Sequence, residues 1–153
     1  MAFAARPVTG ADVVPLENIT VHPEQDRFIA PNIVTIAQAR FETGAYDFCL
    51  WDGDTRVGLI ALIDMAEHDD REEIDDPEAV YVWRLLIGKD FQRRGHGKAA
   101  MDFAEDWARK RSRRCVQIQA VEDNVAAIAM YQALGYTLTG HKSGKEVQLE
   151  KVL

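Results

Sequence analysis

The residues best suited to chemistry form a basic turn with two glycines, Gln92-Arg93-Arg94-Gly95-His96-Gly97. An apolar stretch at residues 80–87 precedes the turn and predicts a buried strand. Residues 98–111 follow it with apolar side chains at helical spacing. The first turn of a helix carries unpaired N–H groups, and glycine lets an anion approach the backbone closely. The order strand, turn, helix therefore predicts a phosphate or pyrophosphate site, to which the arginines and Lys98 add positive charge.

Two nucleotide-binding motifs compete for this turn. The phosphate loop of nucleotide triphosphatases requires Gly-Lys-Ser/Thr, and the Ala99 that follows Gly97-Lys98 excludes it. The dinucleotide fingerprint Gly-x-Gly-x-x-Ala fits residues 95–100, and Glu122 ends the next predicted strand. In dinucleotide-binding folds, however, the first glycine follows its strand almost directly. Here the polar run 89–94 intervenes, so the context favours a different family.

A third motif, Gln/Arg-x-x-Gly-x-Gly/Ala after a strand, agrees with the turn at each defined position. Through this motif the sequence resembles the GNAT superfamily of acetyl-CoA-dependent N-acetyltransferases. The resemblance implies that acetyl-CoA is the co-substrate and that backbone amides of the turn hold the coenzyme A pyrophosphate. The cofactor-binding residues implied here are Gln92, Arg93, Arg94, Gly95, His96, Gly97 and Lys98.

A second motif supports the resemblance. After a predicted strand at residues 115–121, the sequence has Asn124-x-x-Ala127, a helical segment with Tyr131, and then Leu134-Gly135-Tyr136. This order is similar to the later pattern of the GNAT superfamily, which implies that Asn124 and Ala127 contact the cofactor. Asn124 and Tyr131 are seven residues apart, or two helical turns, so both lie on one helix face.

Tyr131 is the general acid that the resemblance implies. When an amine attacks a thioester and the tetrahedral intermediate collapses, a thiolate leaves and must be protonated. A thiol has a pKa of about 8.5 and tyrosine one of about 10, values close enough for a tyrosine within hydrogen-bonding reach to supply the proton. The alternative role for Tyr131 is that of a half-buried core aromatic.

The strand before the turn carries further expectations. In the family its backbone diverges from a neighbouring strand and pairs with pantetheine and the thioester carbonyl, which implies backbone contacts by Leu85, Leu86 and Ile87. Arg84 is a charge inside this apolar strand, and is either a paired structural residue or a site residue. The general base is not assigned by the sequence: Glu24, Asp64, Glu78 and the acidic segment 67–78 are candidates.

The net charge of −7 argues against nucleic acid as a partner and favours a cationic ligand. The acidic segment 67–78, EHDDREEIDDPE, is either a solvated loop or part of a binding site. Apolar runs are short and the N-terminus lacks an apolar signal core, so we expect a cytoplasmic protein without membrane association. Cys49 and Cys115 are predicted to be buried thiols, and the histidine spacing predicts no metal site.

A narrower resemblance concerns the acetyl acceptor, a small-molecule amine. Residues 21–32 and 81–87 are similar to those of bacterial spermidine/spermine and diamine acetyltransferases, although Gly88 stands where those proteins typically have Asp. The resemblance implies a polyamine, and the predicted substrate-binding residues are Glu24, Glu78 and Arg84. Peptide N-termini, protein lysines and aminoglycosides are alternative acceptors. A non-catalytic acetyl-CoA-binding module and a dehydrogenase are alternatives from other classes.

The predicted elements form a single domain over residues 1–153. Its fold class is α+β, with a mixed, mostly antiparallel central sheet flanked by helices, as in the GNAT superfamily. The predicted strands are 2–8, 46–51, 56–64, 80–87, 115–121, 136–140 and 146–152, and the predicted helices are 10–18, 34–42, 98–111 and 126–134. Residues 21–32 are expected to be irregular. The resemblance also allows a homodimer, which is common among relatives.

Overall fold

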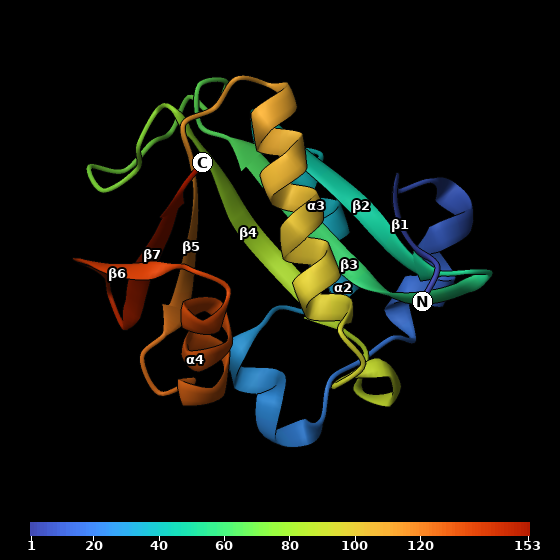
Figure 1. Ribbon diagram of the computed structural model, residues 1–153. Coiled ribbons are helices and arrows are strands. Elements are labelled where there is room, and N and C mark those ends of the chain that lie inside the picture. Colours follow the sequence, from blue (N-terminus) through green and yellow to red (C-terminus); the bar gives the residue numbers. More distant parts are fainter.

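The computed structural model describes residues 1–153, which form one seven-stranded sheet flanked by helices (Figure 1). Neighbouring strands are antiparallel except for β4 and β5, which are parallel. The predicted α+β fold with a mostly antiparallel sheet is confirmed. In spatial order the strands are β1 (Phe3–Pro7), β2 (Ala45–Asp52), β3 (Thr55–Asp64), β4 (Ala79–Ile87), β5 (Cys115–Val121), β7 (Glu146–Val152) and β6 (Thr137–Ser143).

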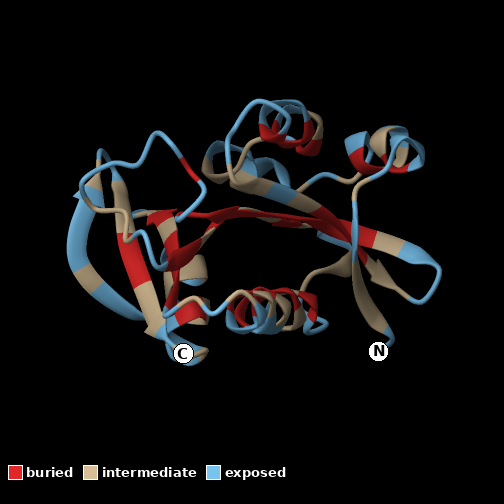
Figure 2. Ribbon diagram, turned by 90° about the horizontal axis from the view of Figure 1, so that it is seen from above, coloured by how far each residue is buried: buried red, intermediate tan, exposed pale blue.

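Helices cover both faces of the sheet. In Figure 2 the long helix α3 (His96–Lys110) lies below the sheet, while α1 (Val13–Glu17) and α2 (Asn32–Ala39) lie above it. Helix α4 (Val125–Ala133) follows β5. Short 3-10 helices are η1 (Gly10–Asp12), η2 (Pro23–Phe28) and η3 (Lys89–Phe91). None of the helices combines the length and the apolar character needed to cross a bilayer.

Most predicted elements occur close to their expected positions, and β5 and β7 have the predicted bounds. The predicted helix 10–18 is divided into η1 and α1. Pro15 fits inside α1 because it lies in the first turn, where its missing N–H removes no intrahelical hydrogen bond. Residues 21–32, expected to be irregular, contain the 3-10 helix η2 and the first residue of α2.

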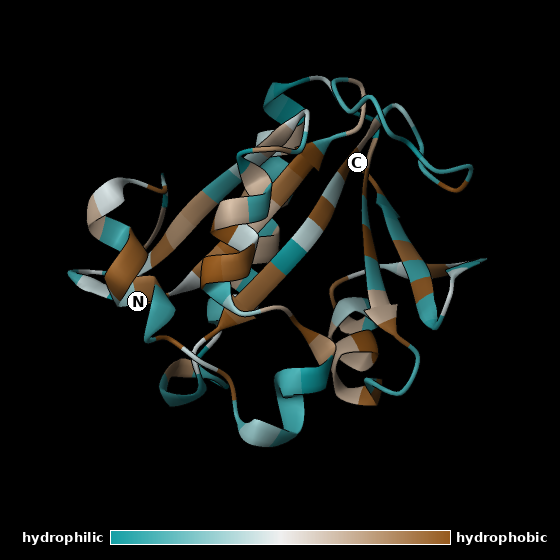
Figure 3. Ribbon diagram, turned by 180° about the vertical axis from the view of Figure 1, so that it is seen from behind, coloured by the Kyte–Doolittle hydropathy of each residue, from teal (hydrophilic) through white to brown (hydrophobic).

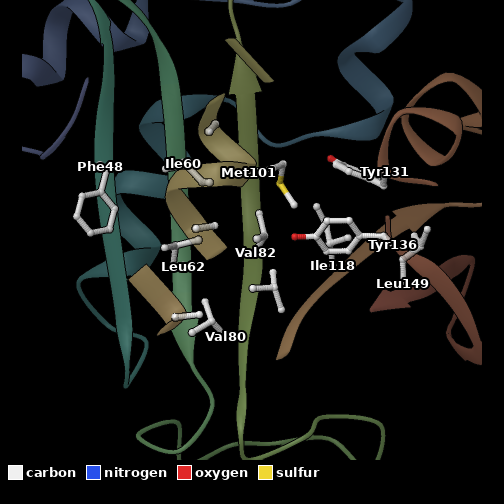
Figure 4. Packing of buried hydrophobic residues seen from close by; sticks show 14 of the residues in the cluster. Phe48, Ile60, Leu62, Val80, Val82, Met101, Ile118, Tyr131, Tyr136 and Leu149 are labelled. Carbon is white, nitrogen blue, oxygen red and sulfur yellow. The ribbon is translucent and has the colours of Figure 1, made fainter. Parts of the chain in front are cut away.

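Buried apolar residues lie on both faces of the sheet. The larger cluster, between the sheet and α3, is shown in Figure 4 and includes Phe48, Ile60, Leu62, Val80, Val82, Met101, Ile118 and Leu149. A smaller cluster on the other face joins Leu16 and Ile36 to Cys49 and Leu59. Figure 3 shows the apolar central strands beside the hydrophilic acidic segment at one end of the sheet. The helices are held by this burial, at roughly 25 cal/mol per Å² of apolar surface.

The two cysteines are free and buried, as predicted. Burial raises the pKa of Cys49 and of Cys115 to about 11. Because the thiolate is the reactive form, both thiols are unreactive at neutral pH.

A β-bulge in β4 shapes the centre of the sheet. The pairing with β3 shifts between Ala61 and Leu62, so Trp83 is an extra residue on β4. A bulge bends its strand and increases the local twist. β4 pairs with β5 only over Ala79–Val82, whereas it stays beside β3 as far as Ile87. Beyond the bulge β4 and β5 therefore diverge, and Figure 1 shows them separating toward η2 and α4.

Asp64 holds two arginines at the opposite end of β3. Its side chain is 0% exposed and accepts hydrogen bonds from Nε of Arg111 at 2.9 Å and Nε of Arg113 at 2.8 Å. Burial by itself would raise the pKa of Asp64, but hydrogen bonds from Arg113, Arg111 and the Ala66 amide outweigh it and hold the pKa below 3.8. A buried carboxylate paired in this way cannot collect a proton from substrate, so Asp64 is removed from the general-base candidates.

We predict that Asp64→Asn lowers the free energy of unfolding by about 3 kcal/mol at pH 7, because two arginines lose their buried partner. A carboxyl with a lowered folded pKa stabilises the protein above its unfolded pKa, and this contribution is lost as pH falls through the folded value. The difference between wild type and variant, measured by urea unfolding, should therefore narrow below pH 3.8. An equal difference at all pH values would contradict the assignment.

His96 ties the start of α3 to the β2–β3 hairpin. Its side chain is 1% exposed, with Nδ1 at 3.0 Å from the Phe91 carbonyl and Nε2 at 3.0 Å from a carboxylate oxygen of Asp52. Hydrogen bonding from His96 lowers the pKa of Asp52. The side chain of His96 is therefore structural, and it positions the turn that precedes α3.

We predict that His96→Leu lowers the free energy of unfolding by about 1 to 3 kcal/mol, because the hydrogen-bonding partners of a buried side chain are left unpaired. Urea unfolding measures the change. His141→Leu is the matched control, since His141 is exposed on β6 and its replacement should change stability by less than about 0.5 kcal/mol. Equal losses in the two variants would show that the His96 hydrogen bonds are unimportant.

Candidate active site

The divergence of β4 and β5 opens a cavity of about 980 Å³. Its walls are β4 from Tyr81 to Ile87, β5 from Ile118 to Val121, the start of α3, one face of α4, and the segment Gln25–Pro31. A volume of this size accommodates an elongated ligand together with a second small molecule. The sheet interruption is thus the candidate active site.

The turn before α3 presents a row of free backbone amides to this cavity. Gly95 precedes α3 with φ 87°, a left-handed conformation that glycine adopts without strain. Arg93 also has positive φ, 63°. No backbone carbonyl accepts a hydrogen bond from the amides of residues 93–98. Free amides at the positive end of a helix are suited to an anion, which is the ligand that the sequence predicts for this turn.

The side chains of the turn have different functions from its amides. Gln92 donates to the Ile87 carbonyl at 3.0 Å and exchanges two hydrogen bonds with Gln25. It therefore fixes the turn to β4 and to η2. Arg93 and Lys98 line the cavity and add positive charge, whereas Arg94 does not line it.

The backbone of β4 beyond the bulge faces the cavity. Leu85, Leu86 and Ile87 line it and pair with β3 on their other side. Their peptide groups on the β5 side have no strand partner, because the pairing with β5 ends at Val82. An extended ligand with amide groups can occupy this edge by adding hydrogen bonds as a strand would.

Helix α4 contributes the residues of the second motif. Asn124 accepts a hydrogen bond from the Ala127 amide at 3.3 Å and so caps the helix. Asn124, Ala127 and Tyr131 all line the cavity. The structure therefore brings these residues together with the turn at residues 92–98.

Tyr131 has its hydroxyl in the cavity without a protein partner. The residue is 7% exposed, and Figure 4 shows its hydroxyl pointing from α4 toward β4. Burial raises the pKa of Tyr131 to about 12. The neighbouring Tyr136 instead donates to Glu105 at 3.0 Å and is buried. Of the two tyrosines, Tyr131 is the one whose proton is available to a ligand.

The three predicted substrate-binding residues are separated by the structure. Arg84 lines the cavity, but Glu24 and Glu78 do not. Glu24 is exposed in η2, and Glu78 lies 3.9 Å from Arg114 near the start of β4. The acidic segment 67–78 contributes no residue to the cavity wall. The cavity is therefore not lined by the carboxylates on which the polyamine hypothesis depends.

Sequence reasoning missed two groups of cavity residues. Gln25 and its neighbours in η2 form one wall, and their only sequence signal was a polar segment without regular periodicity. Glu146 lines the cavity from the first position of β7, half-buried and in no ion pair closer than 4.0 Å. Its signal was a carboxylate at the first position of the predicted strand 146–152. Only the β5–β7 pairing places it opposite Val121, at the cavity end of β5.

Three residues able to bind metal lie close together outside the cavity. The ligand atoms of Asp76, Cys115 and Glu150 lie within 4.8 Å of one another. Asp76 is already paired with Arg114, and Glu150 accepts a hydrogen bond from Gln117 at 2.7 Å. These contacts account for both carboxylates without an ion.

Comparison with known proteins identifies the family to which this site belongs. The model of the Acetyltransferase (GNAT) family matches residues 12–136. The mycothiol acetyltransferase of Geodermatophilus obscurus is 33% identical over 118 residues, which cover 76% of this chain and 36% of that protein. The chain thus spans about a third of the length of this curated relative.

Solved structures share the fold. An acetyltransferase from Thermus thermophilus has a TM-score of 0.78 and 20% identity, with 100% of this chain and 98% of that chain covered. The spermidine N-acetyltransferase from Vibrio cholerae, in complex with CoA and spermine, has a TM-score of 0.73 and 13% identity, with 99% and 95% covered. Because the family model matches most of its residues, the chain belongs to the Acetyltransferase (GNAT) family.

Proposed function

We propose that this protein transfers the acetyl group of acetyl-CoA to a primary amine by direct attack in a ternary complex. The observation that carries the proposal is the unpartnered hydroxyl of Tyr131 in the same cavity as the free amides of residues 93–98. The hydroxyl can protonate a leaving thiolate, and the amides can bind a pyrophosphate. Membership of the acetyltransferase family supports the reaction class.

Each wall of the cavity has a part in this reaction. The amides of residues 93–98, with Arg93 and Lys98, bind the pyrophosphate. The free edge of β4 at Leu85–Ile87 pairs with the pantetheine amides and aligns the thioester. Acetyl-CoA supplies the acetyl group: the amine nitrogen bonds to the carbonyl carbon, and the carbon–sulfur bond breaks. Coenzyme A leaves as a thiol once its sulfur is protonated.

Tyr131 donates the proton to the departing sulfur, and it is reprotonated by the second proton that the nitrogen loses as the amide forms. Its pKa of about 12 keeps it protonated at neutral pH, as a general acid must be. A thiol in water has a pKa of about 8.5, so the proton transfer would be unfavourable there. In the cavity the leaving thiolate loses solvation as well, and this raises the pKa of its thiol just as burial raises the pKa of Tyr131. Because both groups are removed from water, the pKa of Tyr131 and that of the leaving thiol are both raised, and proton transfer between them stays feasible.

Glu146 accepts the proton that the attacking amine loses. An alkylamine has a pKa of about 10.4 and arrives as an ammonium ion. Among the residues that line the cavity only Asp26 and Glu146 are carboxylates, and Asp26 is exposed in η2 while Glu146 is half-buried. Neither Glu24 nor Glu78 is placed to serve the cavity.

A polyamine is the narrower acceptor hypothesis, and its support is a fold shared with an enzyme crystallised with spermine. The cavity itself offers Glu146 and exposed Asp26 against Arg27, Arg84, Arg93 and Lys98, of which Arg27 is paired with Asp123 and Lys98 with Asp102, and this is a poor match for a polycation. Release of coenzyme A thiol should be measured with spermine, spermidine, putrescine, an aminoglycoside, a short peptide and amino acids. Selective turnover of one class identifies the acceptor, and acetyl-CoA binding without any turnover would favour the non-catalytic alternative.

We predict that Tyr131→Phe binds acetyl-CoA with unchanged affinity but loses turnover by roughly 10²-fold or more, the usual scale of general acid catalysis. Calorimetric binding and single-turnover kinetics separate the two effects. Because the pKa is about 12, the wild-type pH–rate profile should show no loss from Tyr131 ionisation below pH 10. Full activity in the phenylalanine variant would remove Tyr131 from the mechanism.

We predict that Glu146→Gln lowers kcat/KM at pH 7 by roughly 10²-fold, because the ammonium loses its proton acceptor. Activity should recover toward wild type as the pH approaches about 10, where the amine is already unprotonated. Glu122→Gln is the matched control, since Glu122 is paired with Lys142 at 2.7 Å outside the cavity. A deficit in Glu146→Gln that is independent of pH would argue against proton transfer.

A further inference from the structure

We infer that the acceptor is an amine that also carries a carboxylate, which Arg84 binds through its guanidinium. This inference rests on the proposed acetyl transfer and names the class of its second substrate. Arg84 lies on β4 directly after the bulge and lines the cavity. Its side chain extends to the face of the sheet that α2 covers, since it reaches two α2 residues. The guanidinium therefore lies on the face of the sheet opposite α3.

Neutral groups hold the guanidinium in one orientation. One terminal nitrogen donates to the Thr35 hydroxyl at 3.0 Å, and the other donates to the Gln38 side-chain carbonyl at 3.1 Å. The guanidinium also lies 4.5 Å from the ring centroid of Trp83. Guanidinium has five N–H donors, so donors remain for a ligand. An oriented, half-buried fork of this kind is suited to bidentate recognition of a carboxylate.

Arg84 has no carboxylate partner in a chain that carries 25 acidic residues against 18 basic ones. None of its nitrogens forms an ion pair within 4.0 Å, although Arg40, Arg56, Arg111, Arg113 and Arg114 all do. Arg93 is the other cavity arginine without such a partner, and it belongs to the pyrophosphate site. A half-buried cation that is left unpaired among so many acids is available for an external anion.

Glu146 supplies the opposite charge in the lining of the same cavity. Burial lowers the pKa of Arg84, and the charges of Glu146 and Glu42 act against that shift, but neither carboxylate forms an ion pair with Arg84. A ligand between the two would meet a negative group at one end and a positive group at the other. An amine with a carboxylate satisfies both, with its ammonium toward Glu146 and its carboxylate toward Arg84. A polyamine would instead place an ammonium against an unpaired guanidinium.

The test compares acceptors that differ only in this charge. Coenzyme A release is measured with several amino acids, including β-alanine and glutamate, and with the same compounds as carboxamides. Conversion to an amide lowers the pKa of an α-amino group and leaves more of it unprotonated, so reactivity alone would favour the amide. We expect the carboxylates to have the higher kcat/KM by roughly 10- to 100-fold, the scale of a charged hydrogen-bonded pair.

Two variants assign the preference to Arg84. In Arg84→Gln the ratio of kcat/KM for carboxylate over amide should fall to about 1, and in Arg84→Glu it should reverse and favour cationic amines. Arg93→Gln is the matched control, because Arg93 also lines the cavity without a carboxylate partner. It should weaken acetyl-CoA binding and leave the ratio as in wild type. A wild-type preference for amides or polyamines, or an unchanged ratio in Arg84→Gln, would overturn the inference.

A binding measurement separates this inference from the proposed reaction. N-acetylated amino acids and their amides are titrated calorimetrically into the coenzyme A complex of wild type and of Arg84→Gln. Carboxylate-selective binding that Arg84→Gln abolishes would support the inference even if no acceptor is turned over, in which case acetyl transfer fails instead. Absence of Arg84-dependent binding would overturn the inference whether or not acetyl transfer occurs.

Discussion

The divergence of β4 from β5 is the constraint on which the rest of the site depends. A parallel pair buried between helices would normally stay hydrogen-bonded along its length, but the extra residue Trp83 bends β4 after four paired positions. The consequence is a row of unpaired peptide groups in the middle of the protein. A ligand with amide groups can offset their loss of hydrogen bonds by completing the sheet edge. The same bend places the turn before α3, the free strand edge and α4 around one cavity.

Electrostatics in this protein depend on which charges are already paired. Several acidic residues are engaged at the far end of the sheet, where Asp64, Glu67 and Asp76 hold arginines. The cavity has the reverse pattern, with two arginines, Arg84 and Arg93, that have no carboxylate partner and a single half-buried carboxylate, Glu146. The net charge of the chain therefore does not predict the charge of the ligand that the cavity suits. The local balance, set by the pairing of strands and loops, is what an incoming substrate meets.

Two neighbouring tyrosines show how surroundings separate function from structure. Tyr131 and Tyr136 have ring centroids 6.3 Å apart, and burial raises the pKa of both. Tyr136 is committed to Glu105, which links the end of α4 to α3. Tyr131 keeps a free hydroxyl that faces the cavity. Residue type and burial are shared, so the hydrogen-bond partner alone distinguishes the structural phenol from the proposed acid.

The sequence by itself predicted the order of the elements, a candidate anion site in the turn before α3, and the position of Asn124 and Tyr131 on one face of one helix. These depend on local patterns: alternating strands, helical spacing, and glycine at a left-handed position. Only the tertiary structure decided which charges meet. Pairing of β5 with β7 brings Glu146 to the cavity, packing of α2 orients Arg84, and Glu24 stays outside. Contacts between residues far apart in the chain follow from sheet order and the bulge in β4, which no local periodicity encodes.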